Sequence, residues 1–194
     1  MELMFEELFK TINQLVDLNA TEKSIFQNAF NFRIVSKNQA LITEGQVATE
    51  LYFINKGLLR LYYNNDGNLI TAYIFREHLF ASSYASFLES SPSIQCLDTL
   101  EDCELLILPK EKLDQLYIDI PKINILTRKI AEQRFINSQK IISSFLLDTP
   151  EIRYKKFAEN NNDLFLRVPH HIIASYLGIT PVSLSRIRKR LLVK

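Results

Sequence analysis

The spacing of apolar residues divides the chain into three regions. Residues 3–30 have a helical period, and a second short helix within them is expected to be capped by Thr21. From Phe32 to Leu108 the period shortens to that of β-strands. From Pro109 onward the helical period returns. The pattern therefore predicts an α+β protein in which a β domain is flanked by helices.

Short segments rich in β-branched and aromatic residues are predicted as strands. They are residues 32–35, 40–42, 51–54, 58–63, 69–75, 94–100 and 104–108. Turn residues separate them, and the strongest hairpin signal is the Asp66-Gly67 pair. Closely spaced antiparallel strands joined by such turns are typical of a β-roll or jelly roll.

The longest helical pattern covers residues 121 to about 147, and its apolar residues fall on more than one face. Such a helix needs two partners, which we expect to be its own β domain and a second copy of the chain. The residues expected to form this dimer helix are Ile123, Leu126, Ile130, Ile141 and Phe145. The heptad is imperfect because Gln133, Arg134 and Asn137 interrupt it.

A domain boundary is predicted at Asp148-Thr149-Pro150. Thr149 can cap a new helix and Pro150 can occupy its first position, where no amide hydrogen is needed. Residues 1–147 are therefore expected to form one domain that includes the long helix, and residues 148–194 a second, smaller domain.

Two short helices joined by a tight turn are predicted between His170 and Lys194. Ala174 is small where two crossing helices approach, and Gly178 supplies the positive φ that the turn requires. Thr180 can cap the second helix, which starts at Pro181. Apolar residues follow ten and thirteen positions after the alanine. This spacing is typical of a DNA-binding helix-turn-helix.

The charge is distributed unevenly along the chain. From Leu164 to the end there are six Lys and Arg residues and no Asp or Glu, whereas the whole chain has a net charge of +1. The first 163 residues therefore carry −5. A basic end on an acidic body is typical of binding to the phosphate backbone of nucleic acids. The alternative is a solvated basic hairpin packed on the body, and the spacing of the turn favours DNA binding.

Composition argues against several other classes of protein. Two cysteines fit a reducing cytoplasm and are too few for a disulfide framework or a four-cysteine iron–sulfur cluster. The N-terminal residues lack the features of a signal peptide, and no stretch reaches the roughly 18 apolar residues of a membrane helix.

The β domain offers little for catalysis or metal binding. His78 is its only histidine, whereas a metal centre needs several converging ligands. No nucleophile–base pair is evident. We therefore expect neither an enzyme nor a bound cofactor or metal.

The order of helical lid, β-roll, long helix, hinge and helix-turn-helix resembles the Crp–Fnr family of bacterial transcription regulators. The resemblance is most specific in IASYLGITPVSLSRIRKRL and next in the hinge DTPEIRYKKF. The first motif looks most like members common in Bacteroidetes. The resemblance implies a cyclic-nucleotide-binding-like sensor and a cytoplasmic homodimer whose winged helices read a palindromic site in double-stranded DNA. It also implies RNA polymerase as a partner, and the wing is expected to be reduced or missing.

The sensor departs from the members of that family that bind cyclic AMP. Their Gly-Glu and Arg-Ser pairs hold the ribose and the cyclic phosphate, whereas Ala81-Ser82 and Ser93-Ile94 stand near those places here. No Arg lies between Glu77 and Lys110, so tight binding of cyclic AMP is not expected. The expected effector pocket, for an unknown and more apolar ligand unless the roll is vestigial, comprises Phe75, Ala81, Ser82, Ser93, Ile94 and Leu97.

The resemblance implies base contacts from the start of the recognition helix and from one Arg a turn later. These positions hold Pro181, Val182 and Arg186, of which Arg186 can fork onto a guanine edge. The expected phosphate contacts are Thr180, Ser183, Ser185, Lys189, Arg190, His170 and His171.

Two functions remain open from the sequence. The first is a DNA-binding transcription regulator with a ligand-sensing or vestigial β-roll. The second is a cyclic-nucleotide-binding-like regulatory module that acts through protein contacts without binding DNA. The basic C-terminal end and the spacing of the turn favour the first.

Overall fold

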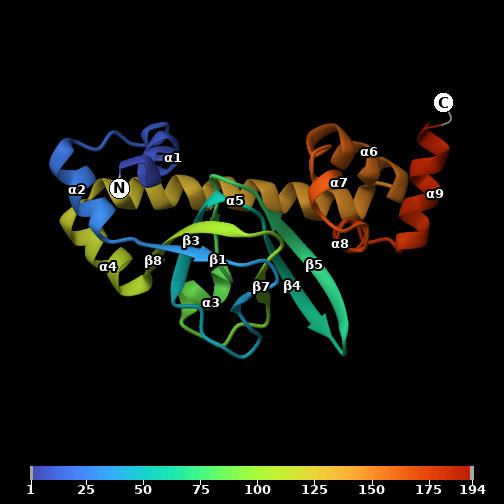
Figure 1. Ribbon diagram of the computed structural model, residues 1–194, viewed down its shortest axis with the longest axis horizontal. Helices are drawn as coiled ribbons and strands as arrows, with labels where there is room; N and C mark the ends of the chain where they lie inside the picture. Colours follow the sequence, from blue (N-terminus) through green and yellow to red (C-terminus); the bar gives the residue numbers. More distant parts are fainter. Residues whose placement is uncertain (1, 193–194) are drawn as a thin grey trace.

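The computed structural model describes residues 2–192, which form an elongated molecule built on one long helix (Figure 1). The helices are α1 Glu2–Asn13, α2 Ala20–Asn28, α3 Tyr84–Glu89, α4 Lys110–Asp119, α5 Lys122–Leu147, α6 Pro150–Asn160, α7 Leu164–Arg167, α8 His170–Tyr176 and α9 Pro181–Leu192. The strands are β1 Asn31–Val35, β2 Ala40–Ile42, β3 Glu50–Lys56, β4 Leu59–Asn65, β5 Asn68–Phe75, β6 Phe80–Ala81, β7 Cys96–Thr99 and β8 Cys103–Pro109.

The β domain consists of two four-stranded antiparallel sheets, in the orders β1-β8-β3-β6 and β2-β7-β4-β5. This arrangement confirms the predicted α+β class and its jelly-roll-like β domain. The sequence pattern missed β6 and α3 because each is shorter than a reliable period. It placed the other strands within a few residues of their observed bounds.

The hairpin between β4 and β5 forms as its two central residues require. Asn65 pairs with Asn68, which leaves Asp66 and Gly67 as a two-residue loop. Both have positive φ, 50° and 87°, as a type I′ turn needs. The side chain of Asn64 accepts a hydrogen bond of 3.0 Å from the backbone N–H of Gly67. The predicted hairpin is confirmed.

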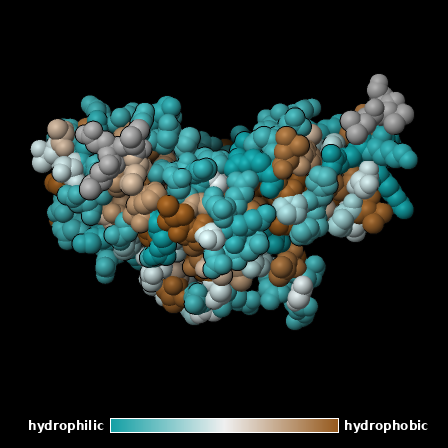
Figure 2. Space-filling model, viewed as in Figure 1, coloured by the Kyte–Doolittle hydropathy of each residue, from teal (hydrophilic) through white to brown (hydrophobic). Residues whose placement is uncertain are grey.

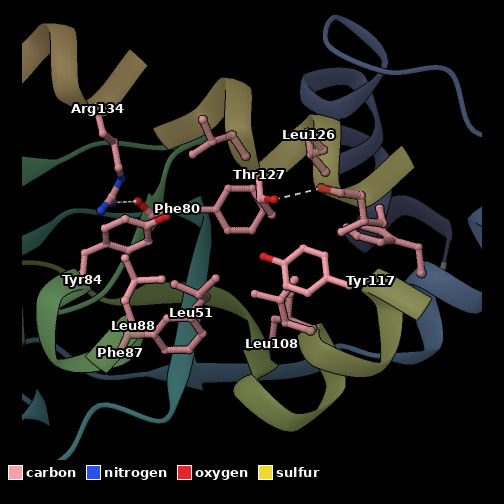
Figure 3. Close-up of a pocket in the computed structure, with 14 residues that line it drawn as sticks. Leu51, Phe80, Tyr84, Phe87, Leu88, Leu108, Tyr117, Leu126, Thr127 and Arg134 are labelled. Atoms are coloured by element: carbon pink, nitrogen blue, oxygen red, sulfur yellow. Dashed lines mark hydrogen bonds between the residues drawn. The ribbon is translucent and has the colours of Figure 1, made fainter. Parts of the chain in front are cut away.

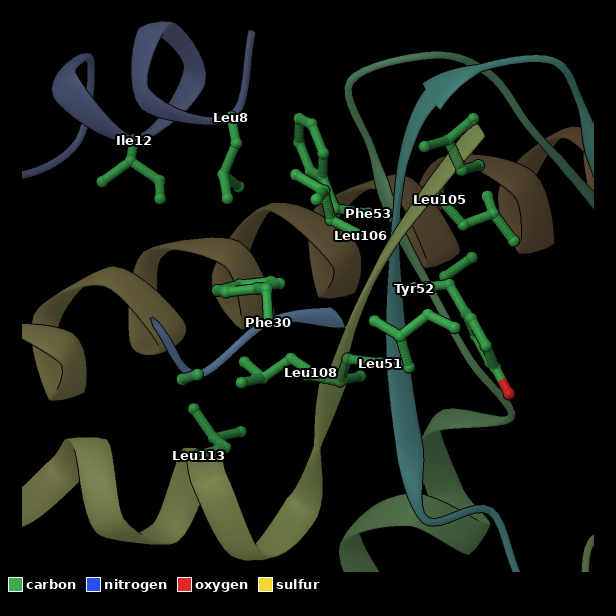
Figure 4. Packing of buried hydrophobic residues seen from close by; sticks show 14 of the residues in the cluster. Leu8, Ile12, Phe30, Leu51, Tyr52, Phe53, Leu105, Leu106, Leu108 and Leu113 are labelled. Atoms are coloured by element: carbon green, nitrogen blue, oxygen red, sulfur yellow. The ribbon is translucent and has the colours of Figure 1, made fainter. Parts of the chain in front are cut away.

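The main hydrophobic core lies between the sheets and the helices at the N-terminal end of the molecule. Figure 4 shows Leu8 and Ile12 of α1 facing Phe53 and Leu106 of neighbouring strands, and all four are fully buried. The predicted cap of α2 was wrong in position. Its N-cap is Asn19, which forms a capping box with Glu22, so the helix begins one residue before Thr21.

The long helix α5 changes character along its length. In its first turns Ile123 and Leu126 are fully buried against their own β domain, and Ile130 packs on the same core. Ile123 and Leu126, which were expected in the dimer helix, are thus covered within one chain, whereas Ile130 is only partly buried. In the rest of α5, Ile141 is half-buried, whereas most of the other apolar side chains are exposed. The exposed ones are Phe135, Ile136, Ile142, Phe145, Leu146 and Leu147.

The C-terminal helices begin with α6 at Pro150 and pack against the β domain. The Thr149 hydroxyl accepts the backbone N–H of Ile152 at 3.3 Å, and Pro150 opens α6. A second hydrophobic cluster joins the two parts, with Leu58, Ile74 and Leu100 on one side and residues of α6, α7, α8 and α9 on the other. None of the helices formed by residues 2–192 is both long and apolar enough to span a membrane.

Ion pairs also join the two parts of the molecule. Arg167 on α7 bonds Glu77 at 2.5 Å and Glu101 at 2.6 Å, all three less than one-third exposed. These two carboxylates raise the pKa of Arg167, with hydrogen bonding to Glu101 the larger cause. Arg76 pairs with Asp163 at 2.5 Å. The C-terminal helices are thus held to the β domain by apolar burial and by partly buried charges.

Strand β7 of the second sheet carries a partly buried carboxylate, Asp98. Oδ1 of Asp98 is buried and has no hydrogen-bond partner within residues 2–192. Burial raises the pKa of Asp98 from 3.8 to about 6, although the charge of the buried Arg60 opposes this change. The folded protein therefore binds a proton at Asp98 more tightly than the unfolded chain does. The ionised form lowers stability above pH 6, and the penalty disappears as the pH falls below 3.8.

Asp98→Asn is therefore expected to raise the free energy of unfolding at pH 7 by about 1–2 kcal/mol, after allowance for partial exposure. The gain should shrink as the pH is lowered from 7 to 4. Urea unfolding at several pH values measures it, and Asp114→Asn at an exposed site on α4 serves as the control. A less stable Asp98→Asn protein at pH 7 would show that attraction to Arg60 dominates instead.

Candidate nucleic-acid interface

The turn between α8 and α9 depends on Gly178 for two reasons. Its φ is +64°, a conformation that residues with a Cβ adopt at a cost. A Cβ at this position would also lie 2.6 Å from Cε1 of Phe145 on α5. Ala174 on α8 is fully buried. Its carbonyl accepts a hydrogen bond of 3.0 Å from the backbone N–H of Ile179. The sequence prediction of a positive φ at Gly178 is confirmed.

The helix α9 starts as predicted. The Thr180 hydroxyl accepts the backbone N–H of Ser183 at 3.1 Å, and Pro181 is the first helical residue. Leu184 and Ile187 are buried and fix one face of α9 against α8 and α6. The opposite face is left to solvent, and Figure 2 shows mainly hydrophilic side chains over this end of the molecule.

Two cations on the exposed face of α9 have no anionic partner among the described residues. Arg186 and Lys189 are exposed, and within residues 2–192 neither forms an ion pair or a side-chain hydrogen bond. Val182, 59% exposed, lies on the same side of the helix start, as does the exposed Pro181. The three residues expected to contact bases are therefore all open to solvent.

Other basic residues of α9 are already engaged. Arg188 lies 5.3 Å from the ring centre of Phe165, and its Nη1 is 2.8 Å from Nε2 of His170. Arg190 pairs with Glu151 on α6. His170 and Arg190, both expected to contact phosphate, thus have partners within the chain. The exposed side chains among the remaining expected phosphate contacts are Thr180, Ser185, Lys189 and His171, with Ser183 half-buried.

Most residues of the expected effector pocket are buried. Phe75, Ala81 and Leu97 are packed into the core, whereas Ile94 is 70% exposed. The hydroxyl of Ser82 donates to the Glu50 carbonyl at 2.8 Å. Ser93 lies within hydrogen-bond distance of Ser83 Oγ, 2.7 Å away. The hydroxyls of Ser82 and Ser93 thus have hydrogen-bond partners outside the expected pocket set.

A hollow lies elsewhere, between the first sheet, α3, α4 and α5 (Figure 3). The hollow is partly open to solvent. It is lined by Phe26, Leu51, Phe80, Tyr84, Phe87, Leu88, Leu108, Leu113, Tyr117, Ile123, Leu126, Thr127, Ile130 and Arg134. None of the six expected pocket residues is among these. No sequence pattern signals the hollow, because its residues come from elements far apart in the chain.

His78 lies close to an acidic side chain of α1. Its Nε2 lies 3.6 Å from a carboxylate oxygen of Glu7. No group of three or more His, Cys, Asp or Glu side chains within residues 2–192 is arranged to hold a metal ion.

Comparison with known proteins agrees with this architecture. Residues 32–119 match the family model of the cyclic nucleotide-binding domain. A search of curated protein sequences found no match.

Several solved structures share the fold over most of the chain. The c-di-GMP responsive global regulator CLP of Xanthomonas campestris has a TM-score of 0.74 at 19% identity, with 90% of this chain and 92% of that chain covered. FixK2 of Bradyrhizobium japonicum also has a TM-score of 0.74, at 16% identity over 84% and 85% of the two chains. The catabolite activator protein of Thermus thermophilus has a TM-score of 0.57 at 20% identity, over 90% and 84%. The matches include Crp/Fnr-family regulators, so the fold is the one found in that family.

Proposed function

We propose that this protein is a DNA-binding transcription regulator of the Crp–Fnr type that acts as a homodimer. The observation that carries the proposal is the exposed face of α9, where Arg186 and Lys189 lack counter-ions within residues 2–192 and Thr180 caps the helix start. A helix that offers unpaired cations and a free N-terminal turn suits entry into the major groove.

The proposed dimer forms along the second half of α5. Its exposed apolar stripe includes Phe135, Ile142 and Leu146, which recur at intervals of seven and four residues. The stripe lies on the part of α5 that leaves the β domain. Burying it against the same stripe of a second copy removes apolar surface from water, and twofold symmetry makes the two surfaces identical.

The proposed division of labour places the sensor in residues 1–147 and the DNA-binding unit in residues 148–194. Asp148 stands at the hinge, where its carboxylate accepts Ser144 Oγ at 2.6 Å and pairs with Lys156 at 2.7 Å. The effector is a small molecule that binds the sensor. The shared fold with regulators of transcription supports RNA polymerase as a further partner.

The test is selection of DNA from random duplexes by the full chain, followed by anisotropy titrations of the selected site at several salt concentrations. We expect a palindromic sequence whose half-site centres lie about one helical turn apart. With Lys189 of each of two copies on a phosphate, the slope of log affinity against log salt should be about −2 or steeper. A chain that selects no sequence and binds duplexes without salt dependence would instead indicate a module that acts through protein contacts.

A further inference from the structure

The hollow between the first sheet and α5 is apolar over most of its lining. Leu51 and Leu108 come from neighbouring strands, Phe87 from α3, and Ile123 and Leu126 from the start of α5. Figure 3 shows these elements enclosing the space, with Arg134 of α5 at one end. A concave apolar surface with a few polar groups at one end is the usual form of a small-molecule site.

Arg134 brings a positive charge to this hollow without a matching carboxylate. Its Nη2 donates to the Phe80 carbonyl at 2.5 Å, and its guanidinium lies 4.9 Å from the ring centre of Tyr84. No ion pair to Arg134 forms within the described part of the chain. Burial lowers the pKa of its guanidinium, which shows that the surroundings penalise the charge. Of the five guanidinium donors, only one has a partner among residues 2–192.

Two phenol groups add further hydroxyl donors: Tyr84 lies beside Arg134, whereas Tyr117 lies on the opposite side of the hollow (Figure 3). The rings of Tyr84 and Tyr117 line the hollow, and Figure 3 shows the hydroxyl of Tyr117 directed into it. Burial raises the pKa of Tyr84, so its hydroxyl keeps its proton at neutral pH and can donate. The Thr127 hydroxyl, in contrast, is already used by the carbonyl of Ile123 at 3.0 Å.

We propose that this hollow binds a small apolar monocarboxylic acid. Its carboxylate pairs with the free edge of Arg134 and accepts from the Tyr84 hydroxyl, while its hydrocarbon part lies between Leu51, Leu108 and Leu126. The carboxylate gives the unbonded N–H groups of the guanidinium a partner through charge-assisted hydrogen bonds, which are stronger than neutral ones. The apolar part gains the free energy of leaving water.

A cyclic nucleotide suits the hollow poorly. Its ribose hydroxyls and base nitrogens each need a hydrogen-bond partner when buried. Apart from Arg134, the lining offers only the hydroxyls of Tyr84, Tyr117 and Thr127. Because the lining offers so few hydrogen-bond partners, it favours a ligand with one anionic group and no other polar atoms.

The position of Arg134 makes the acid a suitable effector, a role that rests on the proposed DNA-binding function. The same helix continues to Phe145, whose ring contacts the turn at Gly178 and lies 5.0 Å from the guanidinium of Arg153. Arg153 in turn donates to the Leu177 carbonyl at 2.9 Å. A ligand that rearranges Arg134 therefore acts on the helix that supports the turn before α9.

Calorimetry on the full chain without DNA tests the binding. Benzoate and hexanoate serve as probes, with benzamide and hexanamide as neutral counterparts of nearly the same shape. At least one acid is expected to bind, and its amide at least tenfold more weakly. Arg134→Met should weaken binding of the acid at least tenfold. Arg128→Met removes an exposed Arg of the same helix, paired with Glu132, and should leave it unchanged.

A second variant keeps the test decisive if Arg134→Met fails to fold. Leu88 lines the hollow but is 58% exposed, so Leu88→Trp can narrow the opening without disturbing the core. It should weaken binding of the acid while the melting temperature of the free protein stays within a few degrees.

Three results would overturn the proposal: no binding of either acid, equal binding of acid and amide, or tighter binding of cyclic AMP that depends on Arg134. A protein that selects DNA but binds no acid refutes only this inference. A protein that binds the acid but no DNA refutes only its role as effector.

Discussion

Replacing Ile142 by aspartate is expected to turn the proposed dimer into a folded monomer. Ile142 is 51% exposed in the middle of the stripe formed with Phe135 and Leu146, so the change disturbs no core packing within one chain. In a twofold dimer each substitution brings two carboxylates into an apolar seam. Uncompensated buried charges cost about 3–5 kcal/mol, which corresponds to at least a 100-fold weaker association.

Analytical ultracentrifugation at micromolar concentration measures this effect. Ile118→Asp is the matched control, because Ile118 is 74% exposed on α4 and lies outside the stripe. It should leave the dimer intact. If the unchanged protein is itself a monomer at tens of micromolar, or if both variants behave alike, the seam proposed for α5 is wrong. Loss of the dimer should also weaken binding to a palindromic site, because two half-sites are no longer joined.

Arg186→Ala is expected to weaken binding to the selected DNA site by about 1–3 kcal/mol and to relax the preference at one position in each half-site. Arg186 is exposed on the solvent face of α9 and has no partner within residues 2–192. Its guanidinium can donate two hydrogen bonds at once to O6 and N7 on the major-groove edge of guanine. The single ammonium group of a lysine cannot make this paired contact.

Lys189→Ala provides the matched comparison on the same helix. Lys189 is exposed and unpaired in the described residues as well, but its single ammonium suits a phosphate. The variant should bind all sequences more weakly and flatten the salt slope by about 1 for each phosphate that the lysine no longer neutralises. Selection of DNA by the two variants distinguishes the roles. If Arg186→Ala still selects the original sequence, Arg186 contacts phosphate and does not read a base.

The turn and helix-cap preferences of a few consecutive residues were sufficient to predict several features of the fold. The Asp66-Gly67 loop and the left-handed turn at Gly178 formed as predicted, because few residues other than glycine tolerate those backbone angles. Thr149 and Thr180 cap helices at the positions expected from the prolines that follow them. These features depend on a few consecutive residues, so the sequence contains all the information they need.

The candidate DNA-binding face could be predicted only in part. The spacing of buried residues in α9 determines which side faces solvent, so the exposure of Arg186 and Lys189 follows from the sequence. That Arg188 packs on Phe165 and that Arg190 pairs with Glu151 does not follow from it. These contacts join residues 23 and 39 positions apart and depend on how α6 and α7 fold back on α9.

By itself, then, the sequence determined the order and type of most elements, the turn before α9 and the concentration of positive charge at the C-terminal end. Each of these arises from periodicity, turn chemistry or composition. Only the tertiary structure decided which apolar side chains of α5 are covered, since Ile123 and Leu126 are buried by strands and helices distant in the chain. It also created the hollow beside Arg134. A cavity is the space left by side chains from many elements, so it becomes visible only when those elements have packed together.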